Sequence, residues 1–108
     1  MNPQELSPPD ALLTLVLPAA LEDDVLDWLQ GQTELVSGFS LLHGQGLGPH
    51  TTLTTSLERV QGRARRTLVQ LALEQGSAQA LVARLRQAWP LAEITYWISP
   101  LLAFGRLA

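Results

Sequence analysis

The sequence contains no cysteine and no lysine, and it has only two histidines among 108 residues. Without cysteine, the chain has no disulfide, no thiolate ligand for a metal and no thiol nucleophile. Aromatic residues make up 6% of the chain, and the formal net charge is −3, which disfavours a general nucleic-acid-binding protein. No apolar run approaches the roughly 20 residues that a membrane-spanning helix needs, so we expect no direct membrane insertion.

The first ten residues hold three prolines and no basic residue. They lack the charged start and the apolar centre of a signal peptide, so we expect a cytoplasmic protein. We expect residues 1–10 to form a flexible N-terminus and residues 11–108 to form a single domain. Hydrophobic residues make up 46% of the chain, which is enough for a core and for a subunit interface.

A strand–helix–strand pattern occurs twice along the chain. In each copy an apolar run is followed by a segment whose apolar residues recur at helical spacing, and then by a second apolar, β-branched run. Two such units predict an α+β fold, a ferredoxin-like βαββαβ sandwich in which an antiparallel sheet carries two helices on one face. The predicted elements are Ala11–Leu17, Ala19–Gln30, Leu35–His43, Arg63–Glu74, Ala78–Trp89 (with Ser77 as its N-cap) and Glu93–Ser99.

The first predicted strand is apolar on both of its faces. A strand that faces solvent on one side would instead alternate between apolar and polar residues. Two helices can cover one face of the sheet, so the other face needs a partner, most simply the sheet of another subunit. The apolar tail Leu101–Ala108 is expected to form a short strand or to pack against a neighbouring subunit.

The segment Gly44–Thr55 contains three glycines, a proline and a run of threonines, and we expect it to be a mobile loop. Basic residues follow the loop. Strand alternation places Arg63 and Arg65 on one face and Arg66 on the other. Together with Arg106, these guanidinium groups could hold a phosphate or a carboxylate. Contacts between subunits and simple solvation are alternative roles for them.

His43 directly precedes this loop and His50 lies within it. Neutral imidazole is a common ligand of zinc, copper and nickel. Two histidines per chain make an incomplete metal site, so a fuller site needs another subunit, or oxygen ligands from Glu58 or Asp10. The alternative is that His43 merely ends a strand and His50 is solvated.

The acidic residues near the start of the first helix are expected to form its solvated face, and the tryptophans are expected to lie in the core and at interfaces. No serine, histidine and carboxylate combination or pair of carboxylates suggests catalysis, so we predict a protein without catalytic activity. The acidic residues are Glu22, Asp23, Asp24 and Asp27, and the tryptophans are Trp28, Trp89 and Trp97.

Four segments, together spanning roughly residues 11–106, carry a family resemblance: Leu15-Val16-Leu17-Pro18, Ser37-Gly38-Phe39-Ser40, the stretch from His43 to Arg66, and Tyr96-Trp97. They resemble the PII signalling proteins and their CutA copper-tolerance relatives. The local sequence is most similar to a subgroup of PII-like proteins of unknown function, whose genes tend to lie beside heavy-metal RND efflux pumps.

This resemblance implies a homotrimer with its sheets facing inward and ligands bound in clefts between subunits. It also implies a loop after the second strand that changes shape to engage a partner, here a heavy-metal efflux transporter or another membrane protein. Well-studied PII proteins carry a glycine-rich phosphate-binding segment with a lysine before the second helix. This chain has Glu74-Gln75-Gly76-Ser77 at that place, and its loop has no tyrosine. These differences disfavour the ATP/ADP sensing of well-studied PII proteins. The candidate ligands that stay open are a nucleotide and a divalent transition metal, with no cofactor assigned.

The function predicted from the sequence is that of a PII-like regulatory protein. It would sense a small ligand or metal between subunits and act on its partner through residues 44–55. One alternative is a CutA-like protein that binds a divalent metal directly. A second alternative is a small enzyme of the dimeric ferredoxin-like barrel type.

Overall fold

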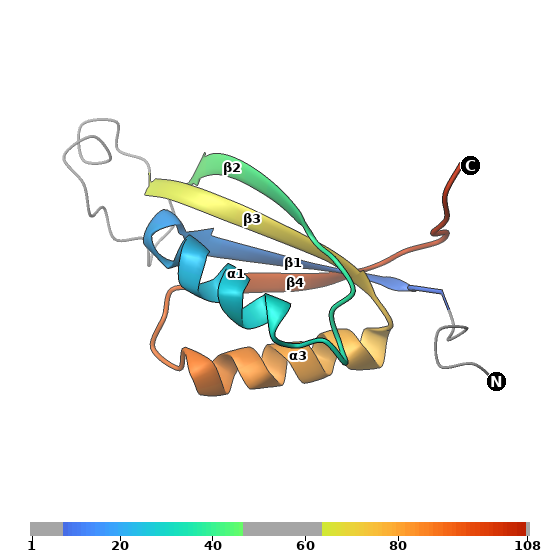
Figure 1. Ribbon diagram of the computed structural model, residues 1–108. Helices are drawn as coiled ribbons and strands as arrows, with labels where there is room; N and C mark the ends of the chain where they lie inside the picture. The colour runs from blue at the N-terminus through green and yellow to red at the C-terminus, as the bar shows by residue number, and fades with distance from the viewer. Residues whose placement is uncertain (1–7, 47–63, 108) are drawn as a thin grey trace.

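The fold consists of one four-stranded antiparallel sheet and two helices, seen in a computed structural model that describes residues 8–46 and 64–107 (Figure 1). The strands lie side by side in the order β2-β3-β1-β4, and every neighbouring pair is antiparallel. The predicted α+β, ferredoxin-like fold is confirmed. The elements are β1 (Ala11–Pro18), a 3-10 turn (Ala19–Leu21), α1 (Glu22–Gln30), β2 (Ser40–Gly46), β3 (Ala64–Leu73), α3 (Gln75–Ala88) and β4 (Thr95–Pro100).

Both helices lie on the same face of the sheet (Figure 1). Side chains alternate between the two faces along a strand, so every second residue of β1 and β3 points toward the helices. These residues form the core with the apolar faces of α1 and α3, and burial of this apolar surface is the main stabilising contribution to the fold. The core consists of Leu13, Leu15, Leu17, Val69, Leu71 and Leu73 from the strands and Val25, Leu29, Ala78, Leu81, Val82 and Leu85 from the helices.

No described element covers the opposite face of the sheet, here called the open face. Its central position is Thr14, which the register places beside Gln70 of β3 and Trp97 of β4. Trp97 is 46% exposed and Leu42 is 53% exposed. Large apolar side chains are usually buried, so this degree of exposure on one face is unusual. The expectation of a two-sided apolar sheet with one uncovered face therefore holds for the described residues. The open face includes Leu12, Thr14, Val16, Leu42, Leu68, Gln70, Ala72 and Trp97, and the register also places Pro18, Ser40, Arg66, Thr95 and Ser99 on it.

The second strand begins later than the sequence predicted, at Ser40 instead of Leu35. The carbonyl of Gln32 accepts hydrogen bonds from the amides of Leu35 and Val36, at 3.0 and 2.8 Å. These bonds close a turn directly after α1, so the chain reverses before it can join the sheet. Apolar residues in this turn pack against the core, so its sequence has the same apolar pattern as a strand.

The N-cap predicted for the second helix is also wrong, because α3 begins at Gln75 and Ser77 lies inside its first turn. The backbone amide of Gln75 instead donates a 2.9 Å hydrogen bond to the Oδ1 atom of Asp10. The first amides of a helix have no partner within the helix, and a carboxylate at this end also suits the helix dipole. A residue 65 positions away in the sequence therefore supplies the cap.

Trp28 and Trp89 contact each other edge to face, with ring centroids 5.7 Å apart. They join α1 to the C-terminal end of α3, which agrees with the core role expected for two of the three tryptophans. Residues 101–107 form no strand in this structure, and Leu102, Phe104 and Leu107 are exposed. Of the two expectations for this tail, the short strand is wrong within one chain, and packing against a neighbour remains a prediction.

None of the described helices has the length and apolar character that crossing a membrane requires.

Candidate functional site

Polar side chains gather at the ends of β2 and β3, where the chain leads into and out of residues 47–63. We call this group the loop-end site, and it consists of Glu22, His43, Arg65, Arg66 and Thr67. The antiparallel register places His43 of β2 directly opposite Thr67 of β3. Glu22 is the first residue of α1, which follows β1. In the sheet, β1 is the neighbour of β3 on the side opposite to β2. The fold thus brings three separate segments of the chain to one place.

Glu22 is the centre of the hydrogen bonding at this site. Its Oε1 atom accepts a 2.6 Å bond from the hydroxyl of Thr67 and lies 2.5 Å from the Nε2 atom of His43. The Thr67 hydroxyl, followed by the bond to His43, holds the pKa of the Glu22 carboxyl below its ordinary value of 4.5. Both bonds favour the charged carboxylate because they are made to its lone pairs. The Thr67 residue is fully buried, while the His43 side chain is 68% exposed.

The prediction that Glu22 belongs to a solvated helix face is wrong, because its carboxylate turns toward the sheet. Asp23, Asp24 and Asp27 are exposed, as expected. The sequence does carry a signal for this difference. Glu22 precedes the buried Val25 by three positions, so it shares the face that α1 presents to the core.

Arg65 and Arg66 lie on opposite faces of β3, as strand alternation predicted. Arg65 has the parity of the helix-side Thr67, and Arg66 pairs with Pro18 on the side of the open face. Arg65 is exposed and Arg66 is half-buried. One chain therefore offers a guanidinium group on each side of the end of this strand. Arg63 and His50, the other residues predicted for this region, lie outside the described residues, as does Glu58.

Arg106 does not join the other arginines within one chain. Arg66 pairs with Pro18 at one end of β1, whereas Pro100, the last residue of β4, pairs with Ala11 at the other end. The tail that carries Arg106 continues from that far end (Figure 1). An anion site that combines Arg106 with Arg66 would need a second copy of the chain.

Asp10 is likewise at the far end of β1 from His43, so it cannot complete a metal site with this histidine in the same chain. Its carboxylate accepts the hydrogen bond from the Gln75 amide at the N-terminus of α3. This contact affects whether the N-terminus of α3 can bind an anion. Helix N-termini bind phosphates through free backbone amides. A negatively charged side chain already occupies this position, so the start of α3 differs physically from a phosphate-binding segment.

Within residues 8–46 and 64–107, no group of three or more histidine and carboxylate side chains is placed to hold a metal ion. His43 nevertheless has one feature typical of metal-binding histidines. Its Nε2 atom lies against a carboxylate, which can only accept a hydrogen bond when ionised, so in the neutral ring Nδ1 is the nitrogen with a lone pair. Such an outer carboxylate fixes the ring orientation and raises the basicity of the ligating nitrogen.

The arrangement of strands and helices is that of the PII-like and CutA proteins. CPII, a nitrogen regulatory PII-like protein from Thiomonas intermedia K12, superimposes with a TM-score of 0.67 at 13% identity, over 92% of this chain and 97% of that one. CutA from Synechococcus elongatus PCC7942 gives a TM-score of 0.67 at 14% identity, over 92% of this chain and 86% of that one. The predicted PII-like, CutA-related character is thereby confirmed at the level of the fold.

The chain belongs to a family described as "Protein of unknown function (DUF3240)", whose model matches residues 7–108. A crystal structure of a DUF3240 protein from Shewanella baltica OS155 has a TM-score of 0.72 and 22% identity, covering 93% of this chain and 98% of that one. No curated protein matches the sequence. The similar structures named here are described as PII-like, CutA and DUF3240 proteins, and none of these descriptions names an enzyme.

Proposed function

We propose that this protein is a PII-like regulatory protein that binds a small anion at the loop-end site. Binding would be transmitted through residues 44–55 to a partner protein. The observation that carries this proposal is the position of Arg65, Arg66 and the cluster around Glu22, at the strand ends that flank residues 47–63. A ligand held there would contact the strands that anchor this segment.

The open face supports a trimeric assembly for this regulator. It presents Trp97 and Leu42 to solvent, and it continues across all four strands of the sheet. Covering such an apolar face against copies of itself removes the exposed area without any further domain. In a trimer with inward-facing sheets, Arg66 would lie beside the subunit interface. Arg106 of one subunit could then approach the arginines of another.

Adenine nucleotides and bicarbonate are the first ligands to test. CPII is described as bound to ADP, AMP and bicarbonate. All three are anions, and guanidinium groups bind phosphate and carboxylate-like oxygens through paired N–H donors. The chain has no lysine and its α3 N-terminus is capped by Asp10, so the arginines must supply the positive charge.

Calorimetric titration of the protein with ADP, AMP and bicarbonate, each alone and in pairs, tests this function. We expect saturable binding of at least one of them, weakened at least tenfold in Arg65→Gln or in Arg66→Gln, since the two guanidinium groups lie on opposite faces of β3. Arg84→Gln is the matched control, since Arg84 lies on α3 and pairs with Glu34. The proposal is wrong if none of these anions binds, or if the control variant loses as much affinity as the more affected of the other two.

A CutA-like metal-binding role is the second candidate, favoured by the contact between His43 and Glu22. The His43 ring is exposed, oriented by a carboxylate and positioned next to residues 47–63. Copies of this site in a trimer, or His50, would have to supply the remaining ligands. The third prediction, a small enzyme of the dimeric barrel type, gains no support from the described residues.

The family resemblance suggests that the partner is a heavy-metal efflux transporter or another membrane protein, contacted from the cytoplasm. A metal signal at His43 and an anion signal at the arginines would both act on the same segment. The two roles differ in their ligands, and the histidine and arginine variants separate them.

A further inference from the structure

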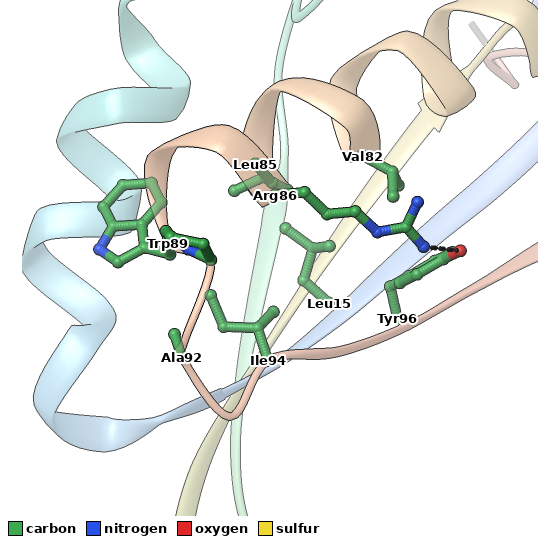
Figure 2. A pocket seen from close by; sticks show the side chains of 9 residues that line it. Leu15, Val82, Leu85, Arg86, Trp89, Ala92, Ile94 and Tyr96 are labelled. Atoms are coloured by element: carbon green, nitrogen blue, oxygen red, sulfur yellow. Dashed lines mark hydrogen bonds between the residues drawn. The ribbon is translucent and has the colours of Figure 1, made fainter.

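A cavity of about 440 Å³ lies between the C-terminal half of α3 and the start of β4 (Figure 2). It is separated from His43 by the width of the sheet, because β4 and β2 are opposite edge strands. This cavity is therefore distinct from the loop-end site. It is lined by Leu15, Val82, Leu85, Arg86, Trp89, Pro90, Ala92, Ile94 and Tyr96.

The body of the cavity is apolar. Leu15 lies at its base, with Leu85 on the helix side and Ile94 on the strand side (Figure 2). Trp89 and Tyr96 lie at opposite sides of the cavity, and the Trp89 indole extends toward α1, where it contacts Trp28 (Figure 2). Ligand cavities in proteins commonly have volumes of about 300–1,000 Å³, and a dry cavity of about 150 Å³ already holds a benzene ring. This one has room for a fused pair of rings.

One side of the cavity is polar and positively charged. The Nη2 atom of Arg86 donates a 3.0 Å hydrogen bond to the hydroxyl of Tyr96, and the guanidinium carbon lies 5.6 Å from the centroid of the Tyr96 ring. The tyrosine oxygen accepts in this bond, so its own proton can be donated to a ligand. A guanidinium group has five N–H donors, so others remain after this bond. No lining residue is acidic.

We propose that this cavity binds a small organic anion with an aromatic body and one carboxylate group. The rings would occupy the space between Trp89, Leu15 and Ile94. The carboxylate would accept hydrogen bonds from the guanidinium of Arg86 and the hydroxyl of Tyr96. A neutral ligand of the same shape would fill the apolar part and lose the interaction with the positive charge, whereas a cation would be repelled by it.

The test compares 2-naphthoate with naphthalene-2-carboxamide, which has the same shape and no charge. Both are titrated into the full chain by calorimetry, and contacts are located by amide and indole NMR shifts. We expect 2-naphthoate to bind at least tenfold more tightly than the amide, with the largest shifts at Trp89 and Tyr96. In Arg86→Gln the two compounds should bind with equal affinity, because the charge that distinguishes them is gone.

Arg84→Gln is the matched control, as it removes an arginine from the same helix that pairs with Glu34 and does not line the cavity. It should keep the tenfold preference. Ala92→Phe, in the loop before β4, should fill the cavity and abolish binding of both compounds without lowering the melting temperature. Absence of saturable 2-naphthoate binding, equal affinity for the two compounds in the wild type, or a preference that survives in Arg86→Gln overturns the proposal. None of these variants touches the loop-end site, so this test is independent of the proposed function.

Discussion

The Oε1 atom of Glu22 lies 2.5 Å from the Nε2 atom of His43, and this contact ties the first turn of α1 to β2. The same oxygen accepts the hydroxyl of Thr67 on β3. One carboxylate oxygen thus fixes the position of a helix relative to two strands that border residues 47–63. A ligand that moves the His43 side chain would therefore alter the contacts of this oxygen with both β2 and β3.

If His43 binds a metal ion, removal of its supporting carboxylate must weaken the site. Glu22→Gln is expected to lower the affinity for Zn²⁺ about 10- to 100-fold, and His43→Ala is expected to abolish binding. Calorimetry with zinc chloride measures both. Glu34→Gln removes a carboxylate that pairs with Arg84 elsewhere and should leave the affinity unchanged. Zinc binding that is equal in the wild type and His43→Ala would rule out direct coordination by this histidine.

Thr14 and Thr67 are both fully buried, but of the two only the Thr67 hydroxyl has a hydrogen-bond partner among the described residues. The Thr14 hydroxyl has none in the described residues, and an unsatisfied buried polar group costs about 1–3 kcal/mol. Thr14→Val should therefore raise the free energy of unfolding by about 1 kcal/mol. Thr67→Val should lower it by about 1.5–3 kcal/mol, because its partner is charged.

Urea denaturation at one protein concentration measures this pair of threonine variants, since the stability of an oligomer depends on concentration. Opposite signs for the two variants are the expected result. Destabilisation by Thr14→Val would mean that its hydroxyl has a partner in the assembled protein.

The core packing predicts that alanine substitution of two leucines changes the free energy of unfolding by very different amounts. Leu29 of α1 is fully buried, whereas Leu91, which follows α3, is 96% exposed. Leu29→Ala should lower the free energy of unfolding by about 2–5 kcal/mol, since it removes apolar contacts and leaves a cavity. Leu91→Ala should change it by less than about 0.5 kcal/mol. Thermal and urea unfolding measure both variants, and similar values for the two would contradict the packing described here.

Glu34 should make a small contribution to the pH dependence of stability. Its hydrogen bond from Arg84 holds its pKa below the ordinary value of 4.5. The unfolded chain therefore takes up a proton at a higher pH than the folded chain does. The stabilisation is present above the ordinary pKa and is lost as the pH falls through the lowered one. Both side chains are exposed, at 58% and 42%, so the effect is screened by solvent.

Unfolding measured between pH 7 and pH 2 for the wild type and Glu34→Gln tests this contribution. The variant should be slightly less stable at pH 7, and the difference should disappear at the acidic end. Arg84→Gln should show the same loss at pH 7. A difference between wild type and Glu34→Gln that is constant across the range would show that the ion pair is not its cause.

The sequence predicts the fold well because the two strand–helix–strand units are encoded by local apolar patterns. It misplaces the start of β2, because the turn at Leu35 and Val36 is as apolar as a strand. It also misses the capping of α3 by Asp10, since that contact joins residues 65 positions apart and no local pattern carries it. Long-range contacts of this kind define the sites of this protein.

The candidate site could be predicted only in part. His43 and the alternation of Arg65 and Arg66 follow from local patterns, and Glu22 could have been found from its spacing to Val25. The separation of Arg106 from the other arginines depends on the strand register, which pairs Pro100 with Ala11 and Arg66 with Pro18. The cavity beside Arg86 arises from the packing of α3 on β4, so composition and periodicity give no sign of it.

Assembly through the open face is the central claim, because the proposed sites between subunits depend on it. Light scattering coupled to size exclusion gives the mass in solution of the wild type, Leu42→Asp and Leu91→Asp. Leu42 lies on the open face, and Leu91 is a more exposed leucine outside it. The account predicts three times the chain mass of 11.8 kDa for the wild type and for Leu91→Asp, and dissociation for Leu42→Asp. A monomeric wild type, or a trimer that Leu42→Asp leaves intact, would contradict it.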